Sequence, residues 1–329
     1  MFLMTQAMDR IDLWGDSIPG NSHKMKTDVM ELGSSHFSNR ALDFIKFVLA
    51  LKWEKGINHK RAIDRFTAHY VWPEDTNCKQ SFDDVPYLIP FIAEGSKKAV
   101  IVVPGGGYCV KEMENEGTLV AQKLQETGIT AFVLWYRCNP YYQPIPLLDM
   151  QRAVRVVRGI AERYGYDKDQ IGAVGFSAGG AQVSLFLNLL MGETTNFEGH
   201  VLDETDSVDD ALNFAGLIYP AVTYNHNPGM RYASFPAEEV RNADRKAQLM
   251  AQYNVLEHFH AQGIPHFVSY GTKDTMVSIE EIKDYIERLQ NSDTPYKLVT
   301  VEGAGHGYGA SDKRYRFWLD ELTAWINKL

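Results

Sequence analysis

Residues 171–180 constrain the fold more than any other stretch, and they read Ile-Gly-Ala-Val-Gly-Phe-Ser-Ala-Gly-Gly. An apolar run leads into Gly-x-Ser-x-Gly, and a run compatible with a helix follows it. This pattern is typical of a nucleophile elbow, a sharp turn between a strand and a helix with a serine at its tip. Gly175 and Gly179 remove side chains that would collide with neighbouring backbone, and Gly180 lets the helix approach the strand. Ser177 is therefore the predicted nucleophile.

A glycine-rich turn that binds a phosphate is the alternative interpretation of this stretch. Such turns end in Gly-Lys-Ser/Thr or contain Gly-x-Gly-x-x-Gly, and neither pattern is present at residues 171–180. The elbow interpretation is therefore favoured, and it requires partners for the serine elsewhere in the chain.

Predicted strands and helices alternate from residue 98 onward, and the strands are continuous apolar runs. Runs of this kind are typical of a mostly parallel sheet covered by helices on both faces. We therefore predict an α/β fold with an eight-stranded sheet and helical insertions. The strands are expected at 11–15, 87–94, 99–103, 129–135, 171–176, 211–219, 265–270 and 296–301, and the main helices at 112–127, 147–164, 178–190, 236–260, 278–289 and 312–328.

The first 85 residues interrupt this alternation. They contain the short strand, two predicted helices at 39–53 and 59–69, and loops at 21–35 and 71–84. We predict that residues 1–85 are a strand plus a helical extension that packs on a main domain of residues 86–329. The first helix is too apolar to stand free in water, so it is expected over the pocket, in its wall, or at a contact between subunits of a homo-oligomer. Pro86 and Pro90 predict that the strand at 87–94 lies at the sheet edge.

A serine needs a base to take its proton and a third group to orient that base. Asp274 follows the predicted strand at 265–270, and His306 lies in a glycine-rich loop after the last strand. Serine, acid and histidine in this order are typical of a fold that carries an elbow. We predict His306 as the base and Asp274 as its orienting acid.

The oxyanion formed during acyl transfer needs backbone N–H donors held in place beforehand. Ala178, directly after the serine, is expected to supply one of them. Gly106 and Gly107, in the loop after the strand at 99–103, are favoured over Gly105 for the others. Tyr108, which follows them, is predicted to line the substrate pocket.

Composition limits the partners. The formal net charge of −9 argues against nucleic acid and anionic membranes as main partners. The three cysteines fit no zinc spacing, and we expect no metal and no cofactor. No signal peptide and no run of 18 apolar residues is found, so a cytoplasmic location is expected.

The sequence resembles the alpha/beta-hydrolases and, within them, the acetyl-esterase and feruloyl-esterase-like carbohydrate esterases, including the acetylxylan esterases. The matching residues are 102–108, 131–137, 152–155, 175–180, 218–220, Asp274 and 305–307. Pro104 departs from the pattern, since the related lipase-like branch has histidine there. The resemblance implies an ester-cleaving enzyme without a cofactor, often acting on acetylated sugars or xylo-oligosaccharides.

These observations predict a serine carboxylesterase that cleaves short-chain, chiefly acetyl, esters of small molecules such as acetylated oligosaccharides. Two alternatives remain open. A serine peptidase of the prolyl-oligopeptidase type shares the elbow and the order of the three residues, although it normally carries a large N-terminal domain. A binding protein with this fold and no turnover is the other.

Overall fold

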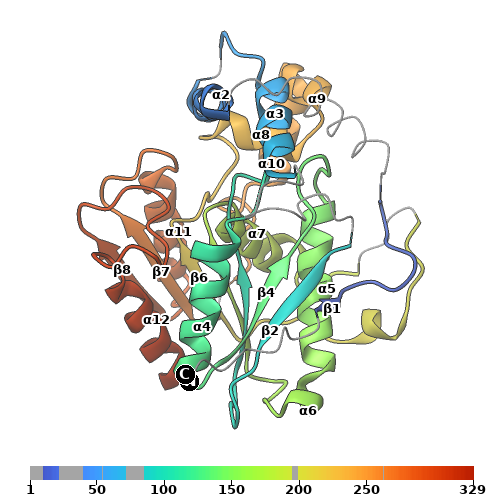
Figure 1. Ribbon diagram of the computed structural model, residues 1–329, viewed down its shortest axis with the longest axis vertical. Coiled ribbons are helices and arrows are strands. Elements are labelled where there is room, and N and C mark those ends of the chain that lie inside the picture. The colour runs from blue at the N-terminus through green and yellow to red at the C-terminus, as the bar shows by residue number, and fades with distance from the viewer. Residues whose placement is uncertain (1–9, 22–39, 54, 72–84, 195–198, 262) are drawn as a thin grey trace.

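The computed structural model describes residues 10–21, 40–53, 55–71, 85–194, 199–261 and 263–329. An eight-stranded sheet in the order β1-β2-β4-β3-β5-β6-β7-β8 forms its centre (Figure 1). From β3 to β8 every pairing is parallel, and β1 and β2 join antiparallel. The predicted mostly parallel sheet is confirmed. The strands are β1 Ile11–Asp12, β2 Tyr87–Phe91, β3 Ala99–Val103, β4 Thr130–Trp135, β5 Ile171–Phe176, β6 Phe214–Ile218, β7 His266–Gly271 and β8 Tyr296–Val301.

Helices cover both faces of the sheet. Successive residues of a strand point to opposite faces, so Val100 and Val102 pack with α4 and α12, whereas Ile101 and Val103 pack with α5, α7 and α11. The α-helices are α2 Arg40–Lys52, α3 His59–Val71, α4 Leu119–Glu126, α5 Ile145–Gly159, α6 Ala161–Tyr164, α7 Ala178–Leu185, α8 Pro228–Ser234, α9 Ala237–Arg241, α10 Ala243–Gln252, α11 Ile279–Asn291 and α12 Phe317–Lys328. Short π and 3-10 segments are η1 Met113–Thr118, η2 Phe186–Leu190 and η3 Glu204–Ser207.

The prediction that residues 87–94 form an edge strand is wrong. β2 lies between β1 and β4, but β1 pairs only with Tyr87 and Leu88. Pro90 pairs with Phe132 on the β4 side, beyond the end of β1. Its missing N–H therefore removes no hydrogen bond from the β1–β2 pairing, and a short neighbour makes a proline acceptable in this strand.

Several predicted helices are divided. The helix expected at 112–127 is η1 followed by α4, and the one expected at 147–164 breaks into α5 and α6. The stretch 236–260 contains α9, α10 and a loop, and α8 lies ahead of it. Of the predicted loops at 21–35 and 71–84, only the first residue of each is described, and Val71 is the last residue of α3; the rest lie outside the described residues.

Two groups of helices from distant parts of the sequence meet at one end of the sheet. The helices α2 and α3 pack against each other and against α8, and α9 and α10 lie beside them at the top of Figure 1. Among the residues described, none of the helices combines the length and the apolar character that crossing a lipid bilayer requires.

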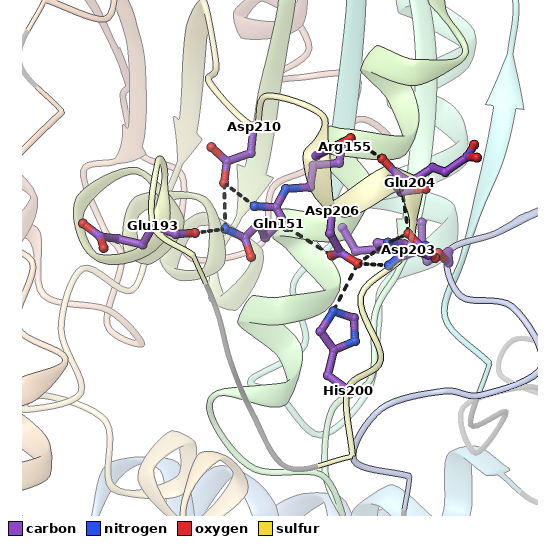
Figure 2. A network of polar contacts seen from close by, with 12 residues as sticks. Gln151, Arg155, Glu193, His200, Asp203, Glu204, Asp206 and Asp210 are labelled. Atoms are coloured by element: carbon purple, nitrogen blue, oxygen red, sulfur yellow. Dashed lines mark hydrogen bonds and ion pairs between the residues drawn. The ribbon is translucent and has the colours of Figure 1, made fainter.

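An arginine and aspartate network fastens residues 199–210 to α5 (Figure 2). Arg152 pairs with both carboxylate oxygens of Asp203 and donates to the carbonyl of Leu13 at 2.8 Å. Arg155 reaches Asp206 at 3.3 Å, and Asp206 also faces the ring of His200 at 3.2 Å. The network joins the segment after β1, α5 and η3.

Candidate active site

The end of β5 forms the predicted elbow. Ser177 has φ 50° and ψ −115°, a conformation that residues with a Cβ rarely adopt. A Cβ on Gly175 would lie 2.2 Å from the carbonyl oxygen of Gly179, and one on Gly179 would lie 2.0 Å from that of Val103. The two glycines are therefore required by close backbone contacts, as the sequence indicated. The amide of Ser177 donates to the carbonyl of Ile218 at 3.0 Å, which ties the elbow to β6.

The three residues predicted as nucleophile, base and acid lie within hydrogen-bonding distance of each other. Ser177 Oγ is 2.8 Å from His306 Nε2, and His306 Nδ1 is 2.7 Å from Asp274 Oδ2. In this arrangement the imidazole can take the serine proton while the carboxylate stabilises the charged ring. The loops after β5, β7 and β8 bring the three side chains together.

Asp274 is held on its other side as well. Its Oδ1 accepts from the amides of Met276 and Val277 at 2.8 and 3.1 Å, and its side chain is fully buried. These bonds fix the carboxylate in one orientation, so that Oδ2 is left to face His306.

In the loop after β3, two backbone N–H groups point away from the hydrogen bonds that the loop makes within itself. The carbonyl of Gly105 accepts from Glu112 N–H at 3.0 Å, and that of Gly106 accepts from Cys109 N–H at 3.0 Å. The N–H of a trans peptide points opposite to its carbonyl, so the N–H groups of Gly106 and Gly107 point the other way. Both glycines line the cavity that contains Ser177.

The third predicted donor, Ala178, is the first residue of α7, where an amide has no partner within the helix. Gly105 is different, because its N–H donates to Glu116 Oε2 at 2.7 Å. This bond agrees with the preference for Gly106 and Gly107 over Gly105 as oxyanion donors.

Tyr108 does not line the cavity, which contradicts the sequence prediction. Its φ of 59° turns the side chain into the core, where it is completely buried and its hydroxyl donates to Gln182 at 3.0 Å. The cavity is bordered by residues on either side of it, Gly107 and Val110. Tyr108 therefore packs on the core side of the loop and supports it there.

The cavity beside Ser177 measures about 370 Å³ and has a largely apolar wall. Phe44, Phe47 and Leu51 of α2 and Phe66 of α3 form one side of it, and Met230 lies on α8. The Phe47 and Phe66 rings stack with their centroids 3.8 Å apart. The helical extension thus supplies part of the pocket wall, one of the positions that the sequence left open.

Glu116 is a site residue that the sequence analysis missed. It is 3% exposed, lines the same cavity as Ser177, and accepts from Tyr219 Oη at 2.9 Å in addition to Gly105. Burial raises its pKa to about 7. The one sequence signal for this residue is that a glycine, Gly117, follows it ahead of a helix. Gly117 lets η1 approach Val133 closely.

Within the described part of the chain, no three histidine, cysteine, aspartate or glutamate side chains are grouped as ligands of one ion would be.

The sheet topology, the elbow and the order of the strand-end loops define an α/β-hydrolase. The chain belongs to the BD-FAE family, whose model matches residues 87–289. The relatives reported below include a named acetylxylan esterase and a named acetyl ester-xyloside hydrolase.

Curated relatives include two proteins of xylan degradation. The chain is 23% identical to an acetylxylan esterase of Xylanibacter ruminicola over 76% of its own length and 49% of the relative. It is 25% identical to endo-1,4-beta-xylanase B of Butyrivibrio fibrisolvens over 78% of its length and 40% of that protein. The chain thus spans about half the length of the curated relatives it matches.

Among solved structures, the chain is similar to the acetyl ester-xyloside bifunctional hydrolase of Caldicellulosiruptor lactoaceticus. The two are 30% identical with a TM-score of 0.65, over 74% of this chain and 88% of the other. An esterase of Thermogutta terrifontis shares the fold at 20% identity and a TM-score of 0.61.

Proposed function

We propose that the protein is a serine carboxylesterase in which Ser177 is the nucleophile, His306 the base and Asp274 the orienting acid. One observation carries the proposal: two hydrogen bonds of 2.8 and 2.7 Å link the three side chains at the edge of a cavity. Family membership supports the same reaction class.

The reaction proceeds through an acyl-enzyme. Ser177 Oγ attacks the ester carbonyl as His306 takes its proton, and His306 then gives that proton to the departing alcohol. Water, deprotonated by His306, next attacks the acyl carbonyl. The bond to Ser177 Oγ breaks, Oγ takes the proton back from His306, and the acid is released. Asp274 stabilises the imidazolium in both steps and remains ionised.

The oxyanion in each step is bound by the N–H groups of Ala178, Gly106 and Gly107. The peptide directions in the loop after β3 and the position of Ala178 at the start of α7 support this assignment. A helix N-terminus also favours negative charge beside it.

The proposed substrates are acetyl esters of small molecules, in particular acetylated sugars or xylo-oligosaccharides. The names of the relatives from Xylanibacter ruminicola and Caldicellulosiruptor lactoaceticus support this substrate class. Aromatic rings such as Phe44 and Phe47 in the cavity wall provide apolar faces on which a sugar ring can pack.

The helical extension then acts as a wall of the pocket. Four apolar side chains of α2 and α3 face the cavity, so the extension excludes water from the part of the substrate they cover. Removing one of these rings is expected to change KM more than kcat.

Hydrolysis of p-nitrophenyl esters from acetate to octanoate by the wild type and by Ser177→Ala tests the function. We expect the highest kcat/KM for acetate, a decline with chain length, and a loss on substitution of up to about 10⁶-fold in kcat. The release of acetate from acetylated xylo-oligosaccharides then tests the substrate class.

Two outcomes contradict the proposal. Ester hydrolysis that survives in Ser177→Ala excludes Ser177 as the nucleophile. If the wild type cleaves no ester, hydrolysis of prolyl peptides or binding without turnover becomes the favoured function.

A further inference from the structure

The carboxyl group of Glu116 lies where three loops of the site meet. It accepts from the amide of Gly105 at 2.7 Å and from Tyr219 Oη at 2.9 Å. Tyr219 Oη in turn accepts from the amide of Gly309 at 3.2 Å, and the Tyr219 ring packs edge-on against the His306 ring with centroids 5.1 Å apart. One side chain thus connects the loops after β3, β6 and β8.

The bond to Gly105 fixes a particular peptide group. The carbonyl of Pro104 accepts from Tyr136 Oη at 2.8 Å, and the N–H of the same peptide donates to Glu116. The peptide between Pro104 and Gly105 is therefore held at both ends. It directly precedes the peptides whose N–H groups, on Gly106 and Gly107, face the cavity.

Glu116 is also close to the nucleophile without touching its hydroxyl. A Cβ built on Gly105 would lie 2.8 Å from Ser177 Cβ and 2.9 Å from Glu116 Oε2. A small rotation of the Pro104–Gly105 peptide would therefore move the two oxyanion donors relative to Ser177, and misplacements of about 1 Å cost up to about 100-fold in rate.

We propose that Glu116 is a positioning residue of the esterase: its carboxylate holds the oxyanion loop through Gly105 and holds His306 in place through Tyr219. This inference rests on the proposed function and adds a residue to its machinery. A carboxylate suits the position because it accepts on both oxygens, and both of its partners here are donors.

The ionisation of Glu116 follows from its surroundings. Burial raises its pKa to about 7, whereas the bonds from Gly105 and Tyr219 and the nearby His306 favour the charged form. Glu112 opposes it, and the phenols of Tyr136 and Tyr308 also face this charge. A proton on Oε1 would compete with the hydroxyl of Tyr219, so the network is complete only above about pH 7.

Steady-state kinetics of Glu116→Gln test the proposal, with Glu114→Gln as the matched control. Glu114 lies on the same π-helical segment and is exposed, so its substitution removes the same charge without touching the network. The amide at 116 can accept from only one of the two donors. We expect kcat to fall about 10- to 100-fold with KM changed less than about threefold. The control should behave as the wild type.

The pH profile gives a readout that a purely structural role would not change. As the pH falls, protonation of Glu116 breaks its network and removes activity in the wild type. Glu116→Gln lacks this titrating group, so the acidic limb of log kcat/KM should become less steep. A wild-type kcat together with an unchanged limb in Glu116→Gln overturns the proposal.

Two further measurements cover the remaining outcomes. If Glu116→Gln does not fold, Tyr219→Phe takes its place. This substitution removes one donor to the carboxylate and should move the acidic limb to higher pH. An unmoved limb overturns the proposal.

If the wild type cleaves no ester, the NMR resonances of the His306 ring decide. An inflection near pH 7 that disappears in Glu116→Gln supports the coupling, and its absence from the wild type overturns it.

Discussion

The backbone of Ser177 has a φ of 50°, a value that glycine adopts far more easily than residues with a Cβ. Such a conformation costs on the order of 1–3 kcal/mol, which the surrounding contacts have to offset. We expect Ser177→Gly to raise the free energy of unfolding by about this amount and to abolish ester hydrolysis. Thermal and denaturant unfolding measure the gain.

Ser177→Ala is the control, because alanine loses the hydroxyl and keeps the Cβ. It should be equally inactive and close to the wild type in stability. Equal stabilisation by both substitutions would mean that the backbone strain contributes nothing, and that the hydroxyl is the destabilising group.

His266 links stability to pH. Its ring is fully buried in β7, with Nδ1 2.7 Å from the carbonyl of Ile264, and burial lowers its pKa from 6.5 to about 4. The folded protein therefore keeps the ring neutral while the unfolded chain takes up a proton below pH 6.5. Stability should be lost as the pH falls from 6.5 towards 4, by up to about 3 kcal/mol.

Urea unfolding across this pH range measures the effect. His266→Asn should flatten the pH dependence and be less stable at pH 7, whereas substitution of the exposed His260 should leave it unchanged. A pH dependence that survives in His266→Asn assigns the acid sensitivity to other groups.

At the scale of elements, α5 is held to the segment after β1 and to η3 by Arg152. The guanidinium is 4% exposed at its side chain, lies 4.6 Å from the centre of the Trp14 ring, and lowers the pKa of Asp203 to about 2. Arg152→Met keeps the length of the side chain but leaves the Leu13 carbonyl and Asp203 without this partner. We expect a loss of about 2–4 kcal/mol in unfolding free energy.

Asp203→Asn is the comparison for Arg152→Met. Asp203 is half exposed at its side chain, so water can replace its lost interaction and the cost should stay below about 1 kcal/mol. Equal losses from both variants would show that the ion pair, and not the buried contacts of the arginine, carries the effect.

The elements that could be predicted from sequence are those whose local pattern decides their structure. β3 and β8 begin and end at the expected residues, because apolar runs are bounded by turn residues there. The elbow was predictable because Gly-x-Ser-x-Gly is a local pattern, although the contact that requires Gly179 comes from the distant Val103. The place of β2 inside the sheet was not, because it depends on β1, distant in sequence, pairing beside it.

The site residues divide in the same way, into those that a local pattern reveals and those that depend on the folded structure. Ser177, Asp274 and His306 could be located from strand ends, but the direction of the Tyr108 side chain depends on a positive φ that the sequence does not reveal. Glu116 is one of three glutamates spaced two apart in its segment, and only the folded loop distinguishes it from the exposed Glu114.

At the scale of the whole molecule, the first 85 residues are joined to the rest through the sheet and through buried charges. β1 pairs with β2, and Arg137, which forms a buried ion pair with Asp149, donates to the carbonyl of Pro19. Trp14 Nε1 also donates to Asp149 at 3.0 Å. Residues 10–21 thus complete the surroundings of a buried charge pair formed by Arg137, after β4, and Asp149 in α5.

A chain of residues 86–329 should therefore be destabilised by at least about 3 kcal/mol and should expose apolar side chains that now face α2 and α3. Thermal unfolding and a dye that binds exposed apolar surface measure both effects. If the shortened chain kept the melting temperature and kcat/KM of the full one, residues 1–85 would be a separate appendage.

The proposed triad comes from loops after β5, β7 and β8, while the proposed donors for the oxyanion come from the loops after β3 and β5. None of these segments can form the site alone, and the loop after β8 follows all the others in the sequence. Hydrolysis can therefore begin only once the final strand has joined the sheet. Ester turnover during refolding would act as a reporter of completed folding, and partly synthesised or partly folded chains would hydrolyse no ester.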